Sequence, residues 1–158
     1  MQTVNVPPFP LSGGCQCGRI RYRLKAMPVV FYLCHCTHCQ KQSSSAYGES
    51  IRVRAADIEI EGQPKGFHVQ AESGAQKVCE FCPDCGTRLF HGRRPEAETF
   101  NIKGGTLDDA AWLRPAGHIW TRSRQAFVTI GADELSFDKG PATYQPLIER
   151  WRQMTGQT

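Results

Sequence analysis

The stretch Cys34-His35-Cys36-Thr37-His38-Cys39 places three thiols within six residues and interleaves them with two imidazoles. Ionised cysteine and neutral histidine are the usual protein ligands of zinc. Catalytic zinc sites use three protein ligands and leave a fourth position for water or substrate. The stretch therefore predicts a metal centre, and its function depends on whether the fourth position is open.

The other five cysteines lie in two flanking groups, Gly13-Gly14-Cys15-Gln16-Cys17-Gly18 and Cys79-Glu80-Phe81-Cys82-Pro83-Asp84-Cys85-Gly86. Residues two apart in an extended segment point the same way, so one metal can bind both thiols of the first group. The Cys-Pro-x-Cys-Gly core of the second group is typical of a zinc knuckle, whose tight turn directs two thiols at one ion. The simplest partition joins four thiolates into a closed structural zinc site: Cys15, Cys17, Cys82 and Cys85.

This partition leaves Cys34, Cys36 and Cys39 as the three thiolates of a second zinc, which we interpret as the catalytic one. The candidates for its fourth ligand are Cys79, a histidine, water and a substrate. A fourth protein ligand would close the site and make it structural. We interpret His35 and His38 as neighbours of the metal or as surface groups rather than as ligands.

Length and composition indicate one globular domain, with 158 residues, 40% hydrophobic and 22% charged. The net charge of +4 is mild and the basic residues are scattered among acids, which argues against a nucleic-acid partner. Residues 1–10 lack the features of a secretory signal, and no segment approaches the ~18 apolar residues of a membrane span. We expect a cytoplasmic protein whose cysteines bind metal rather than form disulfides.

The apolar patterns are mainly those of strands. Prolines near the start predict an extended lead-in over residues 1–11, followed by a single zinc domain over 12–158. A polar turn is expected at 41–45, a short helical turn at 106–112 and a C-terminal helix at 146–154. Strands are predicted over residues 19–24, 29–33, 46–53, 58–60, 67–69, 87–91, 99–102, 118–120 and 127–130. The sequence thus predicts a mainly β fold with few short helices.

Four ordered blocks carry a family resemblance: Gly13–Gly18, Cys34–Lys41, Phe81–Thr87 and Gly104–Asp109, with Pro115 and His118-Ile119-Trp120 beyond them. From about residue 12 to 141 the chain resembles the glutathione-dependent formaldehyde-activating enzymes (GFA), a family that includes the centromere-protein-V (CENP-V) domain and has the Mss4-like fold. The resemblance implies the same two zinc sites as the partition of the thiols above, one with four cysteines and one with three. The chain departs from the family at Ser44, where glycine is frequent, and at Cys79, where arginine or another residue that is not a ligand is frequent.

The resemblance also implies an activity, the joining of glutathione to formaldehyde as S-hydroxymethylglutathione, classed as a carbon-sulfur lyase reaction. A substrate thiol bound at the second zinc would lose its proton and attack a carbonyl. Residues 43–45 and His38 are candidates for proton transfer or hydrogen bonding. Candidates for contact with the carboxylates of glutathione are Arg52, Arg54, Arg88 and Arg93.

Two alternatives use the same cysteines. A domain with two closed structural zincs would be a binding module without chemistry. A domain whose exposed thiolates oxidise and release zinc would be a redox or metal sensor. The fourth ligand of the second zinc distinguishes the binding module from the enzyme.

Overall fold

The computed structural model, which describes residues 3–157, places the strands in two sheets. The smaller sheet is antiparallel and has the order β1-β2-β5. Its strands are β1 (Leu11–Gly14), β2 (Arg21–Leu24) and β5 (Ile58–Glu61). In β2, Tyr22 and Leu24 are buried while Arg23 is exposed, as the alternation predicts.

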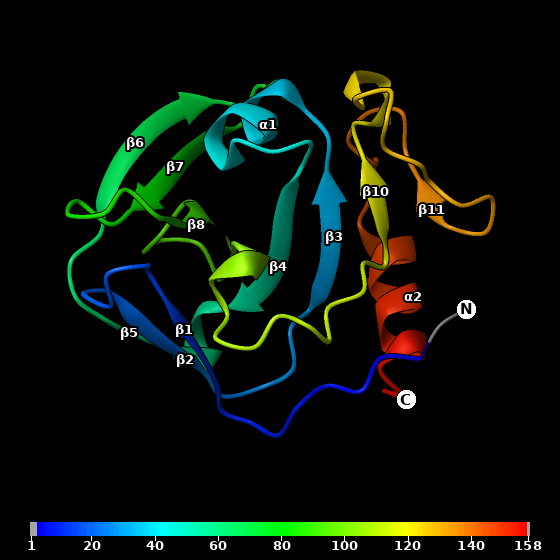
Figure 1. The fold of residues 1–158 in the computed structure, drawn as a ribbon. Coiled ribbons are helices and arrows are strands. Elements are labelled where there is room, and N and C mark those ends of the chain that lie inside the picture. Colours follow the sequence, from blue (N-terminus) through cyan, green and yellow to red (C-terminus); the bar gives the residue numbers. More distant parts are fainter. Residues whose placement is uncertain (1–2, 158) are drawn as a thin grey trace.

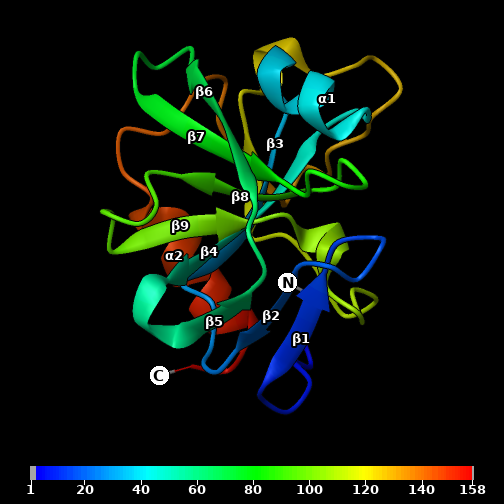
Figure 2. The same cartoon turned by 90° about the vertical axis from the view of Figure 1, so that its left-hand side faces the viewer.

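The larger sheet has eight strands in the order β11-β10-β3-β4-β9-β8-β7-β6. β10 pairs in parallel with β3 and β11, and the remaining pairs are antiparallel. The strands β6, β7 and β8 lie at one end and β3 and β10 at the other (Figures 1 and 2). Their bounds are β3 (Val30–Cys34), β4 (Gly48–Arg54), β6 (Lys65–Gln70), β7 (Gln76–Phe81), β8 (Arg88–Gly92), β9 (Thr99–Ile102), β10 (Gly117–Ile119) and β11 (Leu135–Ser136).

One face of the larger sheet forms the core. Residues paired across antiparallel strands point to the same side, so the register places Phe31, Ile51, Ile102 and Phe90 in one row. All four are buried. The row packs against the smaller sheet, where Phe90 and Tyr22 make an edge-to-face contact with ring centroids 5.7 Å apart.

The opposite face carries polar residues. The next row in the register is Arg52, Asn101, His91 and Cys79. Asn101, His91 and Cys79 are buried and Arg52 is half-buried. Buried polar groups on a central sheet are costly unless they have partners or a function, so this face is a candidate location for a site.

Two α-helices lie against the larger sheet near β3 and its neighbours (Figure 1). The predicted C-terminal helix is α2 (Gln145–Met154), which buries Leu147, Trp151 and Met154. It packs on β3, and its Trp151 indole N–H donates to the carbonyl of Pro28 at 3.0 Å. The segment before β1 also reaches this helix, because Val4 is buried and its N–H donates to the carbonyl of Met154 at 2.7 Å.

The prediction of a turn at 41–45 is wrong in its first part, because a helix, α1 (Thr37–Ser43), occupies those positions. It follows β3 directly (Figure 1). Cys36 is its N-cap residue, and the Cys36 Sγ accepts from the N–H of Cys39 at 3.4 Å. A helix of two turns is too short to show a clear apolar period, and a thiol is not among the usual N-cap side chains. This helix therefore has no signal in the sequence, either in its periodicity or at its N-terminus.

The later part of the chain differs from the prediction at three places. Residues 127–130 hold no strand, and Phe127 is 76% exposed. The edge of β10 is instead paired by β11. The helical turn expected at 106–112 is replaced by a 3-10 turn, η2 (Gly104–Thr106). The other 3-10 turns are η1 (Ala55–Asp57) and η3 (Thr121–Ser123).

The mainly β fold is confirmed, since the structure has eleven strands in two sheets and two α-helices within residues 3–157. The division into a lead-in over 1–11 and a domain over 12–158 stays a prediction. Within the described part of the chain, none of the helices has the length and apolar character needed to cross a bilayer.

Candidate metal centres

Four cysteine sulfurs converge from two distant loops. The Sγ atoms of Cys15, Cys17, Cys82 and Cys85 all lie within 4.8 Å of one another. The distance is 3.5 Å between Cys15 and Cys17 and 3.7 Å between Cys17 and Cys82. A tetrahedral zinc with bonds of about 2.3 Å sets its sulfurs about 3.8 Å apart. The four-cysteine cluster therefore fits a closed zinc site.

Local hydrogen bonds shape this cluster. The N–H of Ile20 donates to the Sγ of Cys15 at 3.2 Å. The Thr87 hydroxyl lies 3.2 Å from the Sγ of Cys85, and this contact, together with backbone hydrogen bonds from Thr87 and Cys17, lowers the pKa of the Cys85 thiol to about 5. Gly86 adopts a left-handed φ of +76°, which lets the chain turn after Cys85. These contacts favour thiolates, the form that binds a metal.

The second cluster lies where β3 passes into α1. The Sγ atoms of Cys34, Cys36 and Cys39 lie within 4.8 Å of one another. They come from the end of β3, from the N-cap of α1 and from its first turn. Hydrogen bonds from the Cys34 and Cys36 thiols lower the pKa of Cys39. The three-cysteine cluster therefore offers three soft donors with one of them ready to ionise, which fits zinc.

Neither neighbouring histidine belongs to the cluster. His35 is fully buried and its Nε2 lies 2.9 Å from the Nδ1 of His118. Burial, followed by the proximity of His118, lowers the pKa of His35 to about 4. His38 is exposed. Among residues 3–157 the metal-like groupings contain cysteines alone.

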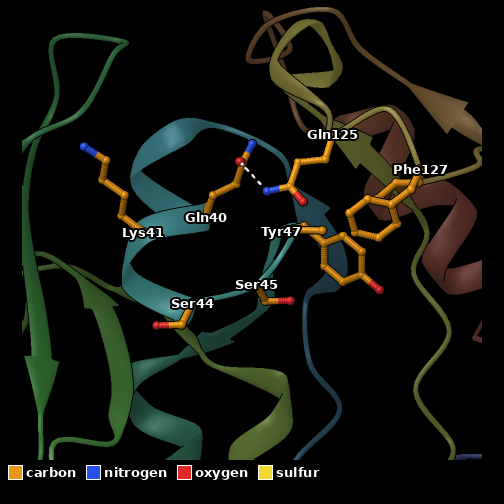
Figure 3. A pocket seen from close by; sticks show the side chains of 9 residues that line it. Gln40, Lys41, Ser44, Ser45, Tyr47, Gln125 and Phe127 are labelled. Carbon is orange, nitrogen blue, oxygen red and sulfur yellow. Dashed lines mark hydrogen bonds between the residues drawn. The ribbon is translucent and has the colours of Figure 1, made fainter.

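Hydrogen bonds from glutamine side chains hold the segment that carries the three cysteines. The Gln40 amide nitrogen donates to the carbonyls of His35 at 2.7 Å and Ser123 at 2.8 Å. The Gln125 amide in turn donates to the Oε1 of Gln40 at 3.0 Å, as Figure 3 shows. A hollow of about 780 Å³ adjoins these residues, and Ser44 lines it (Figure 3). Ser44 therefore faces this hollow rather than the cysteines.

A larger cavity of about 1350 Å³ opens beside the three-cysteine cluster. Cys34, Cys36 and Cys39 all line it, whereas no member of the four-cysteine cluster does. Six cations line the cavity, against three acids, so it attracts anions. The cations are Lys41, Arg52, Lys77, Arg88, Arg93 and Lys139, and the acids are Glu72, Glu96 and Glu98.

The floor of this cavity is the polar row of the sheet. The Asn101 amide nitrogen lies 2.8 Å from His91 Nε2 and 3.4 Å from the Tyr32 hydroxyl. Since an amide nitrogen only donates, His91 Nε2 accepts and the ring is neutral, in agreement with burial, which lowers its pKa. The Arg52 guanidinium lies 3.4 Å from the same hydroxyl and 4.0 Å from the Tyr144 ring centroid.

A buried lysine lies close to the three-cysteine cluster. Lys103 is 7% exposed, and its Nζ has no hydrogen-bond partner among the described residues. A Cβ at Gly48 would lie 3.2 Å from the Sγ of Cys39 and 3.4 Å from this Nζ, so glycine lets the two groups approach. The pKa of Lys103 is lowered by burial, and the charges of Cys39, Cys79 and Cys34 offset this effect only in part.

Comparison with known proteins agrees with this geometry. Residues 10–123 match the family described as glutathione-dependent formaldehyde-activating enzyme. The chain belongs to the GFA family. Among solved structures, the crystal structure of a Rhodobacter sphaeroides protein is similar in fold, with a TM-score of 0.50 and 18% identity over 80% of this chain and 99% of that chain. No curated protein matches significantly.

The two clusters of this GFA-family chain can each bind zinc. Of the four arginines predicted to meet a substrate, Arg52, Arg88 and Arg93 line the cavity, whereas Arg54 is exposed and pairs with Asp57 at 3.8 Å. Cys79 lines the cavity but lies outside the three-cysteine cluster, so its role as fourth ligand stays a prediction.

Sequence reasoning missed the polar floor and the buried lysine. The missed residues are Tyr32, Ser50, His91, Asn101 and Lys103. A usable signal was present in Thr99-Phe100-Asn101-Ile102, where a polar amide interrupts an apolar strand flanked by other apolar strands. In such a strand, a polar residue marks the face that does not enter the core.

Proposed function

We propose that this chain is a zinc-dependent enzyme of the carbon-sulfur lyase type that joins a small-molecule thiol such as glutathione to an aldehyde such as formaldehyde. One observation carries the proposal. The three-cysteine cluster lines a large cavity, whereas the four-cysteine cluster does not. A metal held by three protein thiolates at a cavity wall is the arrangement that a catalytic site needs.

Zinc bound at three thiolates supplies a fourth position at which a substrate thiol is deprotonated. The chain itself supplies the remaining parts of the site. The cavity of about 1350 Å³ has room for a tripeptide thiol, since ligand pockets are usually about 300–1,000 Å³. Its excess of cations favours a substrate that carries carboxylates, as glutathione does.

The four-cysteine cluster serves as a structural zinc site in this proposal. It joins the segment after β1 to the turn between β7 and β8, which lie about 65 residues apart in the chain. An ion pair of 2.7 Å between Arg19 and Asp84 spans the same two segments. Reducing conditions keep such thiols free for metal, so we place the reaction in the cytoplasm.

The test compares zinc content and turnover in matched cysteine variants. Exchange between glutathione with formaldehyde and S-hydroxymethylglutathione is followed by NMR exchange spectroscopy, with zinc content measured on the same samples. Cys36→Ser should lose the second zinc and the enzymatic exchange. Cys79→Ser, the matched control from the same cavity, should keep both. A Cys79→Ser variant that loses the second zinc would show a closed site and contradict the proposal.

A further inference from the structure

The cavity floor contains a hydrogen-bond acceptor that the protein leaves unused. Asn101 is 8% exposed, and its amide nitrogen is engaged by His91 and by the Tyr32 hydroxyl. In this orientation of the amide, both of its N–H groups are taken. Its Oδ1 is buried and has no partner within residues 3–157. An unpaired buried acceptor is costly, which points to a donor supplied by a ligand.

The neighbouring arginine is held in place without an acidic partner. Arg52 is paired with Asn101 in the register of β4 and β9, so the two side chains are adjacent on the cavity face. Its guanidinium packs over the Tyr144 ring at 4.0 Å and contacts the Tyr32 hydroxyl. Arg52 forms no salt bridge in the described part of the chain. A stacked guanidinium with free donors is suited to a carboxylate.

Arg52 lies opposite Val30 in the register of β3 and β4, and its guanidinium reaches along β3 to the Tyr32 hydroxyl, on the side of the thiols. Tyr32, whose hydroxyl Arg52 contacts, lies two residues before Cys34 on β3, and both side chains line the cavity. Two residues of a strand span about 7 Å. Two residues of an extended peptide also span about 7 Å. From this match in spacing we infer that a cysteine whose thiol is at the three-cysteine cluster brings the carboxylate of the next residue toward Arg52.

We propose that Arg52 and Asn101 form a specificity-determining subsite that selects cysteinyl peptides ending one residue after the cysteine. Arg52 binds the terminal carboxylate, and the Oδ1 of Asn101 accepts from the amide N–H of that last residue. The proposal rests on the proposed function, because it places the substrate thiol at the three-cysteine cluster. It adds that a carboxylate on the cysteine itself is too near the thiol to reach Arg52.

The test uses full-length protein loaded with cobalt, whose thiolate charge-transfer absorption reports a thiol at the metal. The probes are N-acetyl-cysteinylglycine, its C-terminal amide, and the ester analogue in which oxygen replaces the glycine N–H. Wild type should bind the acid about 10- to 100-fold more tightly than the amide, as expected for a charge-assisted contact. It should bind the ester about 5-fold more weakly than the acid.

In Arg52→Met the preference for acid over amide should fall below about 3-fold, while in the matched control Arg54→Met it should stay at the wild-type value. Arg54 is exposed and lies outside the cavity, so its loss removes a charge from the same strand without touching the subsite. If Arg52→Met folds poorly, Arg52→Lys keeps the charge but loses the planar donors, and it should give an intermediate preference.

Two results would overturn the subsite, namely wild type binding acid and amide equally, or Arg52→Met keeping the wild-type preference. If none of the three thiols changes the cobalt spectrum of wild type, the proposed function itself fails and the subsite fails with it. The two failures are thereby distinguishable.

Discussion

Replacing Lys103 by methionine tests whether a buried cation stabilises the metal-loaded three-cysteine cluster. Methionine keeps an unbranched apolar side chain of similar length and removes the charge. Three thiolates and one divalent zinc carry a net charge of about −1, or about −2 with a bound substrate thiolate. Lys103 is buried close to this charge, and its Nζ has no hydrogen-bond partner among the described residues.

The size of the effect follows from the geometry at Gly48, where an added Cβ would lie 3.2 Å from the Sγ of Cys39 and 3.4 Å from the Nζ of Lys103, so these two atoms are at most about 6.6 Å apart. At a separation of about 6 Å and an effective dielectric constant of about 20, a unit charge pair is worth about 3 kcal/mol. The loss of Lys103 should therefore lower zinc affinity at the three-cysteine cluster about 100-fold. The metal-free protein should not lose stability, because the variant also removes an unpaired buried charge.

The assay is a zinc competition titration with a chromophoric chelator, which separates the two sites by affinity, combined with denaturant unfolding of the metal-free protein. Lys41→Met is the matched control, since Lys41 lines the cavity but is exposed, and its effect on affinity should stay below about 3-fold. A Lys103→Met variant that binds both zincs with wild-type affinity would refute the electrostatic role of the lysine.

Three further predictions concern packing, backbone strain and the two clusters. Ser44→Gly should raise the free energy of unfolding by about 1 kcal/mol, because residue 44 ends α1 in a left-handed conformation with φ of 50°, and an unchanged or lower melting temperature would contradict this. Gly48→Ala should weaken zinc binding at the three-cysteine cluster about 10-fold in the chelator titration, since its Cβ would lie 3.0 Å from the Cβ of Cys39, whereas Gly105→Ala, with no contact closer than 3.8 Å, should not. In denaturant unfolding with zinc present, Cys82→Ser should cost several kcal/mol more than Cys39→Ser, and equal losses would indicate two structural sites.

The grouping of the cysteines could be predicted from the sequence because their chemistry is local. Pairs two or three residues apart have little freedom in where their sulfurs point, so spacing alone restricts the partners. The structure brings Cys15 and Cys17 to Cys82 and Cys85, the grouping that the count of thiols favoured. The C-terminal helix could be predicted for a similar reason, since its three buried residues repeat at helical spacing over about two turns.

The cavity floor could not be predicted from the sequence, because it depends on strand register. Asn101, His91 and Arg52 come from three strands and meet through pairings that no local pattern specifies. Lys103 looks like any surface lysine in the sequence, and its burial depends on how β9 ends against β4 and the three-cysteine loop. The short helix α1 was missed because its cap is a metal-cluster cysteine rather than a usual capping residue.

The most direct test of the central claim is anomalous diffraction at the zinc edge on crystals of the zinc-loaded protein, with the ligands of both metals resolved. The proposal predicts one zinc bound by four sulfurs, from Cys15, Cys17, Cys82 and Cys85. It predicts a second zinc bound by Cys34, Cys36 and Cys39, with water or a small molecule in the fourth position facing the cavity. A second zinc whose fourth ligand is the sulfur of Cys79 would contradict the proposal and make both sites structural.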